Sequence, residues 1–248
     1  MSVTDAAHTD LQYEASGEDT YRIESAQTFS RVSYAGTERL SIARQGPAWR
    51  FEARATYTRN GPDGRSQSDA AFVQLLQPNG TFEDRVDDDP DFLTILNQPF
   101  AVRLDDATLH DLRELHGHVP FAATSPLGAQ AVLHGFLRPA PGGPVAGRQT
   151  IAVRFEAAGG MTGPLPGYSE TLVAGTMRMQ GTAYYAADTA MLLALNVSLT
   201  LDARLAQGRP AVSVPVRIVY RRVIRAVAKT PPRTQPAAGG ATVAPGAR

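Results

Sequence analysis

The C-terminal third of the chain alternates apolar and polar residues over stretches much longer than an ordinary strand. In "MLLALNVSLTLDARL" (191–205) every second residue is apolar, and from Asn196 on the residues between them are polar, charged or small. The apolar positions are Leu193, Leu195, Val197, Leu199, Leu201, Ala203 and Leu205. Successive side chains of a strand point to opposite faces, so a period of two predicts a β-strand with one buried face.

Two flanking segments, 173–185 and 211–223, repeat this period. Each of the three predicted strands has about 12 residues or more, where the usual length is about five or six. Strands of this length twist and coil, so a sheet that is apolar on one face is expected to curve around what it covers. Pro215 has no backbone N–H, which predicts an edge strand or a bulge at that position.

The N-terminal half has the same character. "WRFEARATYT" (49–58) alternates apolar and charged residues, and "NGPDG" (60–64) predicts a hairpin turn into a strand near 66–77. Further strands are expected within 21–34, 38–43, 132–138 and 151–156. The expected total is eight to eleven strands in one meandering sheet.

Helical signals are confined to one region. "DDATLHDLRELHG" (105–117) predicts a helix with Asp105 or Asp106 as N-cap and Gly117 as its end. Its apolar side carries Leu109, Leu112 and Leu115. A shorter turn is expected to start at Asp89, with Pro90 in the first helical position. Together they predict a short helical insertion, about 90–117, that covers the apolar face of the sheet.

The predicted fold class is therefore mainly β: a large curved antiparallel sheet, a half-barrel or open barrel, with a short helical insertion. Residues 1–10 are expected to be a flexible N-terminus and 11–228 a single antiparallel β domain. Residues 229–248 have no period and are rich in Pro, Ala and Gly, which predicts a disordered tail. The preceding basic run, 221–229, is interpreted as a solvated strand end.

Composition narrows the classes of function. The 24 basic and 24 acidic residues cancel, which argues against nucleic acid as a partner. The absence of cysteine excludes disulfides and thiolate metal sites. The sequence contains no apolar run of about 18 residues, so no transmembrane segment is predicted. The first residues lack the pattern of a signal peptide, so we expect a cytoplasmic protein, or a periplasmic or secreted one if a leader was removed. The preference for arginine over lysine indicates a bacterial coding sequence.

Two groups of residues are candidate metal ligands. Asp87, Asp89 and Asp91 have the alternate spacing that opens many calcium loops, and His110 and Glu114 share a helix face at i, i+4. The glycine and the glutamate that complete a calcium loop are missing, and Asp89 also suits a helix N-cap. We therefore assign no metal site and no cofactor.

The segment "GTMRMQGTAYYAADTAMLLALNVSLTLDARL" (175–205) resembles the paired long strands of bacterial lipoprotein carriers of the LolA/LolB/LppX type. The resemblance covers roughly residues 170–225 and implies a half-barrel that is closed by helices and holds acyl chains. The chain departs from that pattern by lacking a lipobox cysteine. An apolar ligand is expected against the apolar face at Met177, Met179, Tyr185, Leu195, Val197 and Val216.

Three functions follow as hypotheses. The first is a non-enzymatic envelope protein that binds a lipid or another apolar molecule. The second is a structural or interaction module with a solid core that docks a protein partner. The third is a metal-dependent enzyme that uses the region from His110 to His118. No catalytic residue is assigned.

Overall fold

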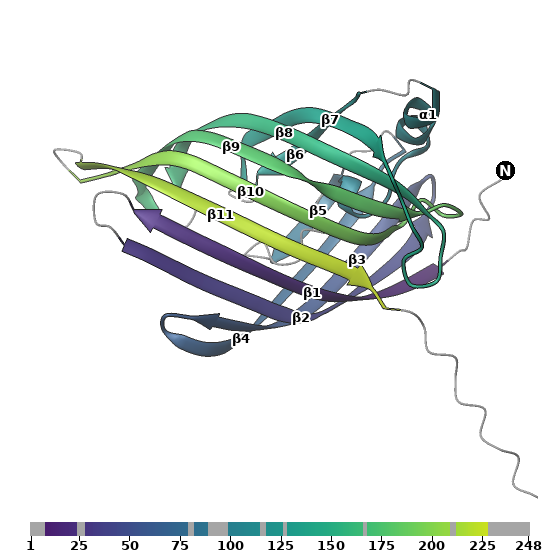
Figure 1. The fold of residues 1–248 in the computed structure, drawn as a ribbon, viewed down its shortest axis with the longest axis horizontal. Helices are drawn as coiled ribbons and strands as arrows, with labels where there is room; N and C mark the ends of the chain where they lie inside the picture. The colour runs from purple at the N-terminus through teal and green to yellow at the C-terminus, as the bar shows by residue number, and fades with distance from the viewer. Residues whose placement is uncertain are drawn as a thin grey trace, which may run out of the picture.

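The first and last strands of the chain pair with each other inside one eleven-stranded antiparallel sheet (Figure 1). The computed structural model describes residues 8–23, 28–78, 82–88, 99–114, 118–125, 128–165, 168–208 and 212–227. The sheet is strongly curved, and the one described α-helix lies at one of its ends (Figure 1). The predicted fold class, a large curved antiparallel sheet with a helical insertion, is confirmed.

The elements have the following bounds. The strands are β1 (His8–Ile23), β2 (Thr28–Gln45), β3 (Ala48–Gly61), β4 (Gly64–Leu76), β5 (Phe82–Asp88), β6 (Val119–Ser125), β7 (Gly128–Ala140), β8 (Thr150–Leu165), β9 (Tyr168–Ala186), β10 (Leu192–Gln207) and β11 (Val212–Ala226). Between β5 and β6 lie the 3-10 turn η2 (Pro99–Ala101) and the helix α1 (Asp106–Glu114).

The strand order is β5-β4-β3-β2-β1-β11-β10-β9-β8-β7-β6, so the sheet consists of two meanders joined where β1 meets β11. The two edge strands, β5 and β6, have seven residues each and are the shortest in the sheet. Short edges limit unwanted pairing with other chains. Because η2 and α1 lie between these two strands in the chain, the helical insertion connects the two free edges of the sheet.

The predicted period of two is confirmed by burial, which alternates along β10 and β11. The strands β9, β10 and β11 have 19, 16 and 15 residues, which confirms their unusual length. The predicted hairpin at 60–64 is also present: Gly61 pairs with Gly64, whose φ of 100° is the conformation that favours glycine.

Parts of 21–34 are in strands, as predicted: residues 21–23 end β1 and residues 28–34 begin β2, with 24–27 outside the described residues. Two other predictions need correction. Strand β1 begins at His8, inside the segment assigned to the flexible N-terminus. Strand β11 is not an edge strand, because it lies between β1 and β10. Its last pair with β1 is at Val216, so at Pro215 the only described partner strand of β11 is β10. The predicted tail, 229–248, lies outside the described residues.

The helix α1 begins as its sequence predicts. The Asp105 carboxylate accepts hydrogen bonds from the Thr108 backbone N–H (2.8 Å) and from the Thr108 hydroxyl (2.6 Å), which identifies Asp105 as the N-cap. Leu109 and Leu112 are buried, as the apolar stripe requires. Residues 115–117, which include the predicted end of the helix, lie outside the described residues, as does the turn predicted at 89–97.

The helical insertion is attached to the sheet beside the turn between β9 and β10. The Leu104 N–H donates to the Ala190 carbonyl (3.1 Å), and the Leu192 N–H donates to the Val102 carbonyl (2.9 Å). The Phe100 ring packs against Phe155, with ring centroids 5.1 Å apart. These contacts bury residues 100–102 and 104, so the insertion covers the apolar face of the sheet at this end.

Tyr185 fixes the insertion from inside the sheet. Its buried hydroxyl donates a 2.5 Å hydrogen bond to the Phe100 carbonyl, and burial raises the Tyr185 pKa so that the hydroxyl remains a donor. We expect Tyr185→Phe to lower the free energy of unfolding by about 1–3 kcal/mol, because a buried carbonyl loses its partner. Urea denaturation measures this loss, and hydrogen exchange should show faster exchange at residues 99–104. The half-buried Tyr184 gives the control: Tyr184→Phe should change neither quantity, and an equal loss would contradict the assignment.

Candidate functional site

The six residues predicted to contact an apolar ligand all lie on the inner face of the sheet. Met177, Met179 and Tyr185 belong to β9, Leu195 and Val197 to β10, and Val216 to β11. Each is at most 7% exposed, and all six belong to one hydrophobic core. The structure therefore places them together on one face, as part of the packing that holds the curved sheet.

These six residues do not form a single pocket. Tyr185 and Met177 are eight positions apart on one strand, a separation of roughly 26 Å at about 3.3 Å per residue. None of the six lines any of the three cavities described below. The Tyr185 hydroxyl is already bonded to the helical insertion.

An apolar cavity of about 360 Å³ lies between α1 and the facing ends of β7 and β8. Its described lining residues are Leu109, Leu112, Arg113, Pro139, Ala140, Gly142, Thr150, Ile151, Ala152, Val153 and Ala187. One wall is the buried side of α1 and the other is the start of β8, so the cavity separates the helical cover from the sheet. Its volume is within the range of small-molecule sites, about 300–1,000 Å³.

The mouth of this cavity has a different character from its walls. Arg113, Gly142 and Ala187 are exposed, whereas Leu112 and Val153 are buried. The opening is therefore at the surface and the apolar walls lie deeper. The cavity therefore combines an apolar interior with one charged side chain, Arg113, at its entrance.

An ion pair beside the mouth holds two loops together. The Arg148 guanidinium contacts the Asp188 carboxylate at 2.5 Å and so joins the segment between β7 and β8 to the turn between β9 and β10. Burial alone would raise the Asp188 pKa, but the hydrogen bond and the charge of Arg148 outweigh it and leave that pKa below its ordinary value. The Asp188 carboxylate is therefore charged at neutral pH, and neither Arg148 nor Asp188 belongs to the cavity lining.

A second constellation lies on the inner face where β1 meets β11. The Arg222 guanidinium and the Asp19 carboxylate form two contacts, of 2.5 and 3.2 Å, and each residue is only 1% exposed. The guanidinium lies 4.9 Å from the Tyr34 ring centroid and 6.0 Å from that of Tyr220. A side chain at Gly17 would have its Cβ 2.9 Å from Arg222, so the glycine leaves space for the arginine.

Other polar groups share this inner face. Tyr57 donates a hydrogen bond to the buried Glu38 carboxylate, and Tyr13 donates to the Leu192 carbonyl (2.9 Å). Gln74 is buried, and its amide nitrogen and oxygen have no hydrogen-bond partner among the described residues. These groups lie on strands β1 to β4, so the inner face is more polar in the first meander than in the second.

The buried ion pair was not predicted from the sequence, and the prediction that Arg222 belongs to a solvated strand end is wrong, because Arg222 is 1% exposed. The signal was present, because Arg222 occupies the apolar phase of β11, between Tyr220 and Ile224. Asp19 likewise stands in phase with Tyr13 and Ala15. A charge at a position where the strand period demands an apolar residue indicates a buried partner on a neighbouring strand.

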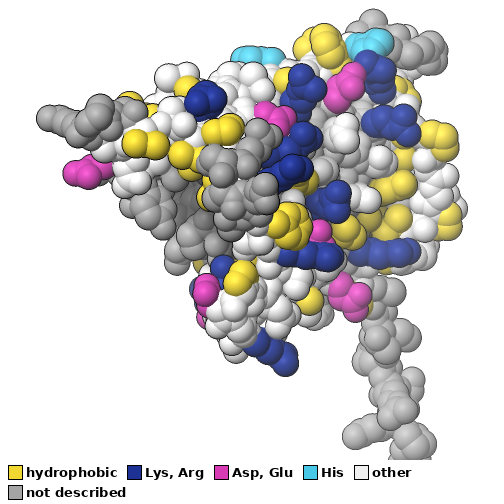
Figure 2. All heavy atoms as spheres, turned by 60° about the vertical axis from the view of Figure 1, so that its left-hand side comes forward, with side chains coloured by type: hydrophobic (Ala, Val, Ile, Leu, Met, Phe, Trp, Pro, Cys, Tyr) yellow, Lys and Arg dark blue, Asp and Glu magenta, His cyan; other side chains and the backbone are white. Residues whose placement is uncertain are grey.

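The outer surface of the sheet is polar. Figure 2 shows arginine side chains spread over it among uncharged, apolar and a smaller number of acidic side chains. Several exposed arginines pair with acids on a neighbouring strand: Arg138 with Glu156 (2.6 Å), Arg217 with Asp202 (3.5 Å) and Arg221 with Glu18 (3.6 Å). We interpret this surface as a solvated face.

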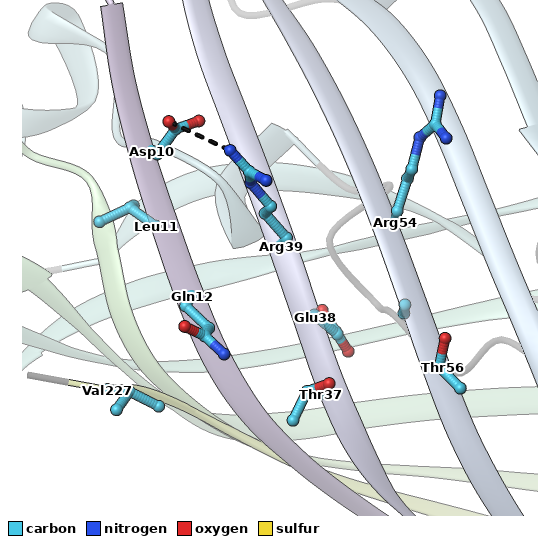
Figure 3. Close-up of a pocket in the computed structure, with 10 residues that line it drawn as sticks. Asp10, Leu11, Gln12, Thr37, Glu38, Arg39, Arg54, Thr56 and Val227 are labelled. Carbon is cyan, nitrogen blue, oxygen red and sulfur yellow. Dashed lines mark hydrogen bonds and ion pairs between the residues drawn. The ribbon is translucent and has the colours of Figure 1, made fainter. Parts of the chain in front are cut away.

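Two polar clefts lie on the outer surface. The larger, of about 580 Å³, crosses β1, β2 and β3 (Figure 3). In it Arg39 and Arg54 are direct neighbours across β2 and β3, and Arg39 reaches Asp10 at 3.4 Å. Both arginine side chains are more than 70% exposed, so water screens them. The second cleft, of about 450 Å³, lies over β8, β9 and β10 and is lined mainly by polar residues. Neither offers the apolar walls of the cavity at α1.

The candidate metal ligands do not converge in the described part of the chain. Asp87 lies in β5, whereas His110 and Glu114 are exposed on α1. Asp89 and Asp91 lie outside the described residues. Among the residues that the structure describes, no group of three or more histidine, aspartate or glutamate side chains is placed to hold a metal ion.

Neither a protein-family model nor a curated protein sequence matches this chain. Within the described ranges, no helix combines the length and the apolar character needed to cross a membrane.

Proposed function

We propose that this protein binds a lipid or another small apolar molecule without catalysing a reaction. The observation that carries the proposal is the apolar cavity of about 360 Å³ between α1 and the ends of β7 and β8. The resemblance to carriers of the LolA/LolB/LppX type supports the same class of function. By that resemblance, the site of action is the bacterial envelope.

The physical basis is the unfilled space between two apolar walls. Leu109 and Leu112 face the sheet, and Ile151 and Val153 form the opposite wall. The space holds roughly ten methylene groups, taking each as about the 30 Å³ of a water molecule. Each methylene group that moves from water into such a site contributes about 0.8 kcal/mol. A single alkyl chain of about ten carbons therefore fits both the volume and the chemistry of the walls.

The first test uses decan-1-ol, a neutral alkyl probe of this size. We expect one molecule to bind per chain with a Kd on the order of 10 µM, as measured by isothermal titration calorimetry. The melting temperature should rise with probe concentration, because the probe binds the folded state. Native mass spectrometry of freshly purified protein should show bound apolar species of similar size.

A variant that fills the cavity gives the matched test. Ile151 is half-buried in the cavity wall, so Ile151→Trp should abolish decan-1-ol binding while circular dichroism shows that the sheet is intact. Thr176 is exposed on β9 and does not line the cavity, so Thr176→Trp should bind like the parent protein. Undiminished binding by a folded Ile151→Trp variant, or no binding by the parent protein, would refute the proposal.

A further inference from the structure

We infer that the ligand of the α1 cavity is a single-chain amphiphile whose terminal oxyanion, a carboxylate or a phosphate ester, pairs with Arg113. The inference rests on the proposed function and adds the chemical class of the ligand. It also assigns Arg113 as the residue that distinguishes an anionic from a neutral head group.

Arg113 is placed at the mouth of the cavity by the geometry of α1. It follows Leu112, whose side chain lines the apolar wall, and it is in the last turn of the helix. Leu112 is buried and Arg113 is exposed, so the guanidinium lies where the apolar wall meets water. An alkyl chain bound along Leu109 and Leu112 brings its terminal group to the Arg113 guanidinium.

The charge of Arg113 is not neutralised by the described residues around it. Of the described residues that line the cavity, Arg113 is the only charged one. The structure records no ion pair or hydrogen bond between its side chain and another described residue. Glu114 and Asp111 are one and two positions from Arg113 in the helix, and side chains at these spacings do not face each other. The nearby Asp188 is already paired with Arg148.

An anionic head group is the partner that this arrangement favours. A guanidinium binds a carboxylate or a phosphate oxygen through two parallel hydrogen bonds, and it repels a cation. The alkyl chain is held by the walls and the oxyanion by Arg113, so the two ends of the ligand are recognised by separate groups. Arg113 therefore contributes to the selectivity between head groups more than to the affinity for the alkyl chain.

The experiment compares three probes of equal chain length: decanoate, decyl phosphate and decan-1-ol. Each is titrated against the parent protein, Arg113→Gln and Arg178→Gln at pH 7. Arg178 is exposed on β9 outside the cavity lining, so its variant controls for the loss of one positive charge. We expect Arg113→Gln to weaken binding of the anionic probes about fivefold, the effect of an exposed ion pair, and to leave decan-1-ol within about twofold.

The outcomes separate this inference from the proposed function. A loss for decanoate alone or for decyl phosphate alone supports the inference and identifies the head group, and a loss for both supports the shared oxyanion chemistry. An equal loss for decan-1-ol, or an equal loss in Arg178→Gln, overturns it. Binding of decan-1-ol with no dependence of either anion on Arg113 overturns the inference and leaves the proposed function standing. If no probe binds, the proposed function itself fails.

Discussion

Asp19→Ala is expected to lower the free energy of unfolding by about 3–5 kcal/mol, because it leaves the Arg222 charge buried without its carboxylate. Both residues are 1% exposed, and two contacts join them across the strands β1 and β11. Urea denaturation followed by circular dichroism measures the loss, since the sheet dominates the signal.

The double variant Asp19→Leu/Arg222→Met is expected to recover most of this stability, because an apolar pair needs no desolvation of charge. The exposed pair of Arg138 and Glu156 provides the control. Glu156→Ala should cost less than about 1 kcal/mol, since solvent screens this pair. An Asp19→Ala variant within 1 kcal/mol of the parent protein would show that the guanidinium reaches water or another anion.

Phe155→Ala is expected to have a comparable effect, a loss of about 3–5 kcal/mol. The Phe155 ring is 1% exposed and packs against Phe100 of the insertion and Phe121 of β6, at centroid distances of 5.1 and 6.2 Å. A Cβ at Gly181 would approach this ring to 2.5 Å, so the ring lies directly over the glycine. Truncation leaves a void where the sheet holds the insertion.

The loss of Phe155 should also loosen the helical insertion before the sheet unfolds. Hydrogen exchange is expected to accelerate at Leu104 and Leu109, whose N–H groups bond to Ala190 and Asp105. Phe136→Ala is the control, because Phe136 is 44% exposed on β7 and should cost less than about 1 kcal/mol. Unchanged exchange in a destabilised Phe155→Ala variant would show that the insertion is held by its backbone bonds alone.

Much of the fold could be predicted from local patterns. The alternation along 191–205 predicted β10 and its buried face, and "NGPDG" predicted the hairpin between β3 and β4. Asp105 and the leucines after it predicted the start and the buried side of α1. Each of these features depends on residues within a few positions of one another, so the sequence carries the information locally.

The candidate site was harder to predict from the sequence. The apolar face at Met177 and Leu195 was predicted correctly as a buried face, but the cavity lies elsewhere, under α1. Its walls come from the helix and from the start of β8, which are about 40 positions apart in the chain. The alternation of residues along a strand shows which face is apolar. It contains no information on where a cavity remains between that face and another element.

The sequence by itself determined a curved antiparallel sheet with one apolar face and a short helical insertion, because strand and helix periods are local properties. Only the tertiary structure decided that β1 pairs with β11, that Arg222 is buried against Asp19, and that the insertion is attached beside the turn between β9 and β10. Asp19 and Arg222 are separated by 203 positions. Contacts of this range depend on how the whole sheet curves around its core, and that curvature also leaves the space at α1 in which we place the ligand.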